Sequence, residues 1–318
     1  MGASTLGSRA IIGTFYNRLE QYLGSSWIDD VSMYFSSNQS SETYAWLGMA
    51  PKMREWVGAR VADSLRENGM TITNVEYEAT LNVLMSELRR DKTGQILIRI
   101  AEMADGTADH WTELLSTLIT NGTSAECYDG QFFFDDNHSE GESGVQKNLL
   151  TTSEVPALVA ASATVPTPTE ASKAILGVIA YMMQYVDDKG NYMNSSAREF
   201  TVMTAPVLWT HLLPAMTNQL VGSGESNSLL NVANDQNFKI KIVANPRLAY
   251  TAQFVTFRTD APTKALIRQE EVGVEIAAIA EGSEYAFDNK QYKYGVSATR
   301  AVGYGDWRYA SYSTLATS

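Results

Sequence analysis

The chain has 318 residues, of which 44% are hydrophobic and 19% charged, and this composition is typical of a folded protein and not of a disordered one. Its 24 basic against 36 acidic residues give a formal charge of −12, which argues against binding nucleic acid through a basic face. The single cysteine, Cys127, excludes an intrachain disulfide and a cysteine-rich zinc site. The longest apolar run, 174–183, is much shorter than the ~20 residues of a membrane-spanning helix, and no signal peptide pattern opens the chain. We therefore expect a soluble protein without membrane contact.

Residues 1–40 are rich in serine and glycine, with only a short amphipathic stretch at 11–22. This pattern favours an extended arm that a neighbouring molecule orders, with Trp27, Tyr34 and Phe35 as its apolar anchors. A loose terminus is the alternative.

Residues 73–85 alternate strictly between apolar and polar, which predicts a long, half-buried strand. Asn68-Gly69 supplies turn residues just before it, so we expect the strand to form a hairpin with the segment that precedes the turn. The stretch 56–65 also fits a helical stripe.

Two helices are expected in the middle of the chain. Apolar residues recur every three or four positions from Ile100 to Leu118, and Asn121-Gly122 ends this helix. The second helix begins with a capping box at 167–170, carries an apolar stripe over 171–186 and stops at 188–191.

The rest of the chain turns increasingly to strands. A strand at 200–203 leads into a helix at 206–213, and a loop follows at 221–237. Alternation then predicts further strands, and the whole pattern indicates an α+β protein. These strands lie at 238–242, 255–257, 272–278, 292–298 and 307–309.

Few residues suggest catalysis or metal binding. The three histidines are His110, His138 and His211, and none has a second histidine at the spacing of a zinc-binding helix. The acidic stretch 135–140, with Glu142 behind it, could supply oxygen ligands but lacks the spacing of a calcium loop, so a solvated loop is favoured. No phosphate-binding glycine loop or nucleophile elbow is found. We predict no catalytic residue, no metal and no cofactor; a metal-dependent hydrolase acting through Asp135–His138 is the competing hypothesis.

Several separated motifs, in order along the chain, carry a resemblance. The segment 43–60 contains Tyr44, Trp46-Leu47-Gly48, Pro51, Arg54-Glu55-Trp56-Val57-Gly58 and Arg60. It closely resembles the Y-x-WLG…P-x-x-REWVG-x-R segment of the Mu-like phage major head subunit (gpT-like) family. The resemblance continues through Tyr128-Asp129-Gly130-Gln131, Phe134-Asp135-Asp136, His138, Asn148-Leu149, Tyr294-Gly295-Val296, Gly303-Tyr304-Gly305 and Trp307.

The resemblance implies the fold of HK97-type capsid proteins. It divides the chain into an N-terminal arm (1–54), an E-loop hairpin (55–90), a peripheral domain (91–155 and 246–318) with a spine helix at 95–121, and an axial domain (156–245). It implies a major capsid protein of a tailed bacteriophage, which self-assembles into the hexamers and pentamers of an icosahedral head around double-stranded DNA. Another virion component, a tail tube or decoration protein, is the alternative.

The same resemblance implies partners and a location. The partners are copies of the chain, a separate scaffold and protease, a portal and decoration proteins; DNA is enclosed without sequence-specific binding. The shell belongs to the virion and assembles in the cytoplasm of the bacterial host. Concentrated aromatic and charged residues make Tyr44, Trp46, Arg54, Glu55 and Trp56 the candidates for an assembly interface. Because 53–91 contains no lysine, we expect no isopeptide cross-link from the E-loop.

Overall fold

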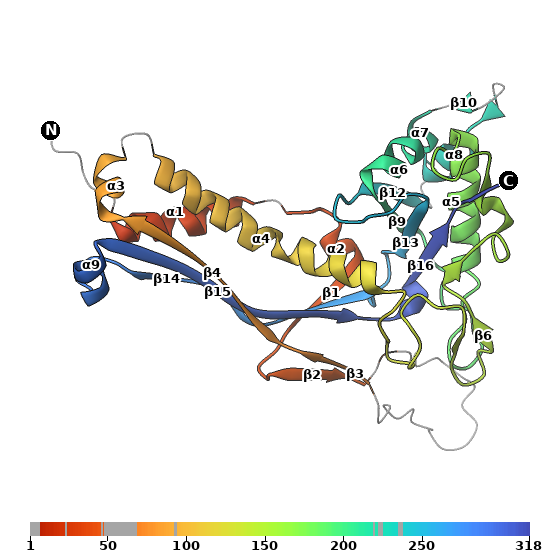
Figure 1. The fold of residues 1–318 in the computed structure, drawn as a ribbon. Helices are drawn as coiled ribbons and strands as arrows, with labels where there is room; N and C mark the ends of the chain where they lie inside the picture. The colour runs from red at the N-terminus through yellow and green to blue at the C-terminus, as the bar shows by residue number, and fades with distance from the viewer. Residues whose placement is uncertain are drawn as a thin grey trace, which may run out of the picture.

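The computed structural model describes residues 7–22, 24–45, 47, 69–91, 94–218, 220–221, 225–234 and 238–318. These residues form an elongated molecule with two parts (Figure 1). One part is a four-stranded sheet of strands β1, β14, β15 and β4, called the long sheet, with helices α1 and α4 beside it. The other part, called the lobe, holds a five-stranded sheet and the helices α5 to α8.

The strands of the long sheet follow the order β1-β14-β15-β4, with the bounds Ser32–Ser36, Leu266–Ile279, Gln291–Tyr304 and Val75–Leu84. β4 confirms the strand predicted at 73–85. Within the described residues β4 pairs antiparallel with β15, while the segment expected as its hairpin partner, before the Asn68-Gly69 turn, lies outside them. Alternation along a strand determines which face is apolar, whereas it does not identify the neighbouring strand.

Helix α4 (Gln95–Asn121) has the bounds predicted for the spine helix and packs against β15. Its apolar side is buried at Ile100, Ala104, Leu115 and Ile119. Gly122 follows the helix with a φ of −60°, so a left-handed cap does not explain why this residue is glycine. A side chain at this position would instead collide with the ring of Phe134.

The expectation of an extended N-terminal arm is wrong for residues 8–36. Ser8–Gln21 form helix α1, which packs along α4, and Ser32–Ser36 form β1, which runs parallel to β14. Ile11 and Phe15 are fully buried in the chain's own core, and Trp27 is 4% exposed. The spacing of these apolar residues suits one helical face, so the segment folds on its own chain without a neighbour.

A short antiparallel pair lies against the long sheet. It consists of β2 (Ser41–Tyr44) and β3 (Met70–Thr73), which enclose residues 45–69 of the chain. Ile72 of β3 packs into the space above Gly303 of β15. These two strands therefore hold the two ends of the segment 45–69, most of which lies outside the described residues.

The sheet of the lobe has the order β12-β9-β13-β16-β7. Its strands are Lys239–Ala244, Glu199–Thr204, Gln253–Arg258, Ala310–Thr314 and Leu149–Leu150. The strands predicted near 200, 240 and 256 are thus confirmed. Trp307–Tyr309, predicted as a strand, is instead a 3-10 turn (η2) directly before β16, where the Asp306 side chain accepts a hydrogen bond from the backbone N–H of Arg308.

Helix α5 (Pro168–Met182) begins with the predicted capping box, in which Thr167 and Glu170 exchange hydrogen bonds. It ends earlier than the predicted stop at 188–191, because Asp187 organises a separate turn. The Asp187 carboxylate accepts hydrogen bonds from the backbone N–H groups of Lys189 and Asn191. Its apolar stripe is buried as expected, at Ala171, Ala174, Ile175, Val178, Ile179 and Met182.

Helix α6 (Pro206–Leu212) confirms the predicted helix after β9, and α7 (Pro214–Thr217) follows it. The expectation of a loop throughout 221–237 is wrong, since Ser228–Asn234 form helix α8. Asn227 stabilises its start, because its side-chain oxygen accepts hydrogen bonds from the backbone N–H groups of Leu229 and Leu230. Leu229 is fully buried and holds the helix to the lobe.

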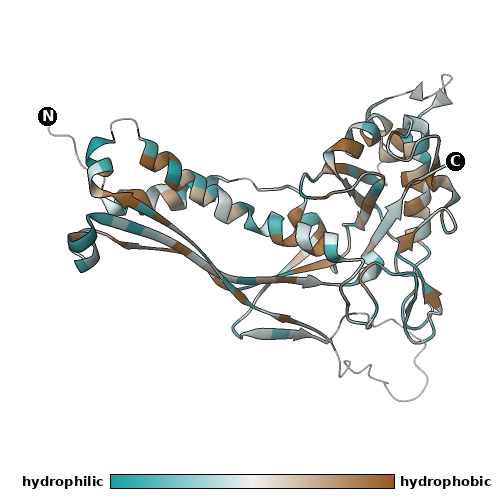
Figure 2. Ribbon diagram, in the orientation of Figure 1, coloured by the Kyte–Doolittle hydropathy of each residue, from teal (hydrophilic) through white to brown (hydrophobic). Residues whose placement is uncertain are grey.

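Hydrophobic stretches recur along α4, α5 and the strands and are interrupted by hydrophilic ones (Figure 2). None of the helices in the described part of the chain is long and apolar enough to cross a membrane. The remaining elements are short. They are α2 (Ile28–Val31), α3 (Met85–Arg90), β5 (His138–Ser139), β6 (Val145–Gln146), η1 (Pro156–Leu158), β8 (Val159–Ala160), β10 (Leu220–Val221), β11 (Glu225–Ser226), α9 (Glu284–Asn289) and β17 (Ala316–Thr317).

Candidate functional site

Motif residues that lie far apart in the sequence meet where the long sheet continues into the lobe. We call Cys127, Asp129, His138, Asn148 and Trp307 the junction network. A turn positions the first two, since the backbone N–H of Cys127 donates to the carbonyl of Gln131 and Gly130 has a φ of +82°. Only glycine adopts this left-handed conformation without strain. β5 and η2 bring the histidine and the tryptophan to this turn.

His138 is the centre of the network and is completely buried. Its Nδ1 lies 2.6 Å from Asp129 Oδ2, and its Nε2 lies 3.1 Å from Asn148 Oδ1. The indole of Trp307 stacks on the imidazole, with ring centres 4.0 Å apart and an angle of 8° between the planes. The expected solvated loop is therefore wrong at His138, although Asp136 and Glu142 of the same stretch are exposed.

Asn148 is held in a single orientation. Its amide nitrogen donates to the carbonyls of Phe133 and Trp307, at 2.8 and 3.3 Å. Its side-chain oxygen accepts from the backbone N–H of Asp135 at 2.9 Å and faces His138. Because the amide nitrogen already has two carbonyl partners, the group that faces the histidine is an acceptor.

Asp129 is the acceptor on the other side of the histidine. Burial by itself would raise the pKa of this carboxyl, but hydrogen bonds from His138, Cys127 and the Gln131 backbone hold its pKa below the ordinary value. The carboxylate is thus negatively charged at neutral pH in an enclosed environment.

A second buried group of charges lies beside the network. Arg308 forms two hydrogen bonds with Asp306, at 2.9 and 2.7 Å, and its Nη1 lies 3.6 Å from Glu140. Burial alone would lower the pKa of the guanidinium, but the carboxylates raise it well above the ordinary value. Removing one partner of such a buried set leaves an uncompensated charge, so these residues hold segments 128–140 and 306–308 together.

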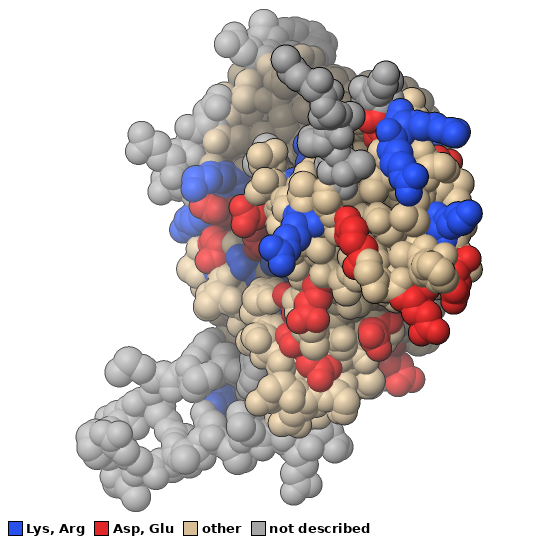
Figure 3. Space-filling model, turned by 90° about the vertical axis from the view of Figure 1, so that its left-hand side faces the viewer, with Lys and Arg blue, Asp and Glu red and all other residues tan. Residues whose placement is uncertain are grey.

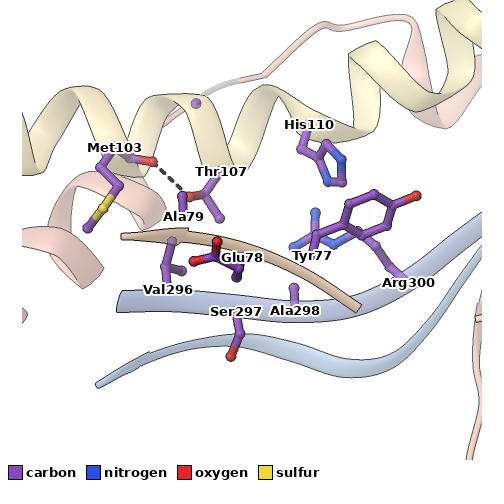
Figure 4. A pocket seen from close by; sticks show the side chains of 11 residues that line it. Tyr77, Glu78, Ala79, Met103, Thr107, His110, Val296, Ser297, Ala298 and Arg300 are labelled. Carbon is purple, nitrogen blue, oxygen red and sulfur yellow. Dashed lines mark hydrogen bonds between the residues drawn. The ribbon is translucent and has the colours of Figure 1, made fainter. Parts of the chain in front are cut away.

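A pocket of about 280 Å³ lies between α4 and the long sheet (Figure 4). His110 projects into it from the helix, and the ring of Tyr77 meets the imidazole edge-on at 4.3 Å. Burial, and then the charge of Arg300, lower the pKa of His110, so the imidazole is neutral at neutral pH. With apolar Met103, Val296 and Ala298 also in the lining, the pocket has the character of packing between helix and sheet. His211, the third histidine, is half-buried on α6.

Only one of the five interface candidates lies in the described part of the chain. Trp46, Arg54, Glu55 and Trp56 lie outside the described residues. Tyr44 is 6% exposed; its hydroxyl donates to Gln269 at 2.8 Å and its ring contacts that of Phe35. In the single chain Tyr44 therefore fastens β2 to the long sheet.

The sequence did not single out Cys127 or Arg308 as functional, nor predict that Asp129 and His138 meet. The available signal was the pair Cys127-x-Asp129 followed by a histidine, which names suitable side chains without placing them together.

On the surface, the end of the molecule with α3 and α9 carries acidic and basic side chains side by side (Figure 3). A phosphate-binding face would need basic residues gathered there.

Known proteins resemble this chain in sequence. A family model described as Mu-like prophage major head subunit gpT matches residues 10–165 and 231–317. The major capsid protein of Escherichia phage Mu is 34% identical over 113 residues, 36% of this chain and 37% of that protein. The Mu-like prophage FluMu major head subunit of Haemophilus influenzae is 30% identical over 112 residues, 35% of this chain and 36% of that protein. The aligned parts thus span little more than a third of these two relatives.

Solved capsid structures resemble it in fold. The procapsid of bacteriophage JBD30 matches with a TM-score of 0.55 at 22% identity, covering 96% of this chain and 74% of that chain. The mature capsid of bacteriophage PhiM1 matches at 0.54 and 14% identity, covering 92% and 87%. The virus-like particle from Pyrococcus furiosus matches at 0.52 and 11% identity, covering 95% and 97%. These likenesses confirm the predicted α+β fold of HK97-type capsid proteins. Because the family model matches most of its length, the chain belongs to the Mu-like prophage major head subunit gpT family.

Proposed function

We propose that this chain is the shell-forming major capsid protein of a tailed bacteriophage head. The observation that carries the proposal is the match to the JBD30 procapsid over 96% of the chain, together with the family membership. Copies of the chain would form hexamers and pentamers that close into an icosahedral shell in the bacterial cytoplasm. The shell would become part of the virion.

The elements support a division into domains similar to the one that the sequence resemblance implied. We assign α4 as the spine helix of a peripheral domain built from 91–155 and 246–318, and 156–245, which contains α5 to α8, as the axial domain. We move the E-loop to 41–73, because β2 and β3 pair with each other at its two ends while β4 belongs to the long sheet. The arm then comprises the residues before β2.

Exposed apolar side chains at separate places on the surface support contacts with further copies. Phe287 on α9 is 83% exposed, and Val207 on α6 is 67% exposed. Several modest contacts of this kind together stabilise a shell, while each contact is weak enough for a wrongly placed subunit to dissociate. The segment with Trp46, Arg54, Glu55 and Trp56 remains our candidate for one of them.

The charge of −12 suits a container whose DNA must move, so we propose that DNA is enclosed without sequence-specific contacts. A scaffold, a maturation protease, a portal and decoration proteins would be separate partners. These partners follow from the family resemblance and need direct tests.

Negative-stain microscopy of the concentrated, purified protein tests the function. We expect closed shells or ring-shaped capsomers; tubes or lasting monomers would instead favour a tail-tube or decoration protein. The variant Trp56→Ala should stay soluble while particle yield falls severely, and Trp56→Phe, which keeps an aromatic ring, should retain most of the yield. An unchanged yield in Trp56→Ala would remove this segment from the assembly interface.

A further inference from the structure

Three side chains of the kinds that bind metal ions converge in the junction network, and shell assembly does not explain them. The Cys127 sulfur, an Asp129 oxygen and a His138 nitrogen all lie within 4.8 Å of one another. Asp129 presents one oxygen to each neighbour, with Oδ1 3.1 Å from Cys127 Sγ and Oδ2 2.6 Å from His138 Nδ1. The side chains of His138 and Asp129 are 0% and 2% exposed, and Cys127 is 6% exposed. The cluster is therefore shielded from water.

The spacing is close to that of a coordination shell. Zinc bonds of about 2.3 Å to sulfur and about 2.0 Å to nitrogen and oxygen place tetrahedral ligands roughly 3.2–3.6 Å apart. The Asp129–His138 and Asp129–Cys127 separations are shorter than this by less than about 1 Å, which small side-chain rotations provide. The sulfur, the nitrogen and a carboxylate oxygen supply three donor atoms, one from each residue.

The hydrogen bonds of His138 require a positive charge at this point. Nε2 faces the side-chain oxygen of Asn148, which is an acceptor, so Nε2 carries a proton. In a neutral ring, Nδ1 would then point its lone pair at the Asp129 carboxylate 2.6 Å away, which is repulsive. Either a second proton or a metal ion must lie between them. A ligating histidine whose other nitrogen donates to a fixed oxygen is the usual arrangement around protein-bound metals.

The two cases use Cys127 differently. With a second proton, His138 and Asp129 are satisfied, and the Cys127 thiol only donates a weak hydrogen bond to Asp129 Oδ1. A divalent cation uses all three residues, and one thiolate with one carboxylate neutralises its two charges, as an enclosed site requires. A mixed set of sulfur, nitrogen and oxygen donors suits zinc among the common divalent ions.

We propose that Cys127, Asp129 and His138 bind one divalent ion of the zinc class, with Asn148 as the residue that orients His138. The ion would have a structural role: with the Trp307 ring stacked on His138, it would join the 127–131 turn to the C-terminal segment at the start of the lobe. This inference does not depend on the capsid function, and it departs from the expectation of a metal-free protein.

Cobalt(II) titration of the chelator-treated full-length protein tests the site. Binding of about one cobalt per chain should produce the near-ultraviolet band of a cobalt–thiolate bond, and zinc should abolish it. The variant Cys127→Ser, which changes one atom, should lose that band. Asp136→Asn, in the exposed acidic stretch nearby, should bind cobalt as the wild type does.

A wild type that shows no thiolate band would overturn the proposal, and so would a Cys127→Ser variant with the wild-type spectrum. Loss of binding in Asp136→Asn would move the site to the acidic stretch and also contradict it. Metal content of the protein as purified is a second measurement that needs no variant. We expect about one zinc per chain, whereas a metal-free, fully folded protein would establish a network held by protons alone.

Discussion

Gly122, Gly303 and Gly305 lie where other segments come too close for a side chain. Gly305, just after β15, would place a Cβ 2.5 Å from the carbonyl oxygen of Lys264 and 3.1 Å from Ala265. Gly303 has no room because Ile72 of β3 occupies the space, and Gly122 lies under the Phe134 ring. The Gly303-Tyr304-Gly305 motif is thus explained by close packing and not by phosphate binding.

Gly305→Ala should lower the free energy of unfolding by about 1–3 kcal/mol, because backbone atoms oppose the new methyl group and cannot rotate away. Gly295→Ala, within β15, is the matched control, because the nearest atom there is 3.6 Å from the added carbon. Urea denaturation of the unassembled chain measures both. Equal losses in the two variants would show that general strand effects of glycine, and not the contact with Lys264, determine the stability.

At the scale of elements, the docking of α1 decides what the N-terminal segment does. Ile11 and Phe15 are buried in a core shared with α4 and the long sheet, and Arg18 forms a two-pronged ion pair with Asp105 at 2.6 and 2.7 Å. At the other end of α1, the hydroxyl of Ser8 donates to Glu281 at 2.6 Å. Exposed ion pairs contribute little, so the apolar side chains must hold the helix in place.

Phe15→Ala should therefore release α1, since truncating a buried phenylalanine costs about 3–5 kcal/mol. Hydrogen exchange should accelerate over residues 8–21 while α5 stays protected. Asn17→Ala, exposed on the same helix, should change the stability by less than about 0.5 kcal/mol. If exchange in α1 is already fast in the wild type, the helix is not docked in solution.

At the scale of the whole molecule, the question is what joins subunits. Cys127 is free and buried, so a disulfide between folded subunits is not available to it. The segment 53–91 contains no lysine, but the revised loop 41–73 includes Lys52. An isopeptide cross-link from this loop could therefore form only through the amine of Lys52, which lies outside the described residues.

We still expect a shell without covalent bonds between subunits. Particles boiled in detergent should run as a single band at the mass of one chain, because interfaces built from many weak contacts dissociate when the fold is lost. A ladder of multimers would contradict this expectation. The variant Lys52→Arg would then show whether Lys52 forms the bond, since arginine keeps the charge and lacks the nucleophilic amine.

The sequence by itself determined the elements whose signals are local. Apolar spacing specified α4, the Thr167–Glu170 capping box specified the start of α5, and alternation specified β4 and β15, because these signals arise among residues a few positions apart. The ordered motifs added the fold and the family, which the comparisons confirmed. The turn at Asp187 and the cap at Asn227 are also local signals. They did not enter the prediction, so the predicted end of α5 was too late and α8 was not predicted.

Only the tertiary structure decided which distant segments meet. Alternation in β4 could not identify β15 as its partner, and the apolar spacing of α1 could not show whether its own chain or a neighbour covers it. Nor could the sequence bring Cys127, Asp129 and His138 to one point beside Trp307. Such contacts follow from the packing of whole elements, because a residue's type and spacing limit what it can bind but do not determine what lies beside it.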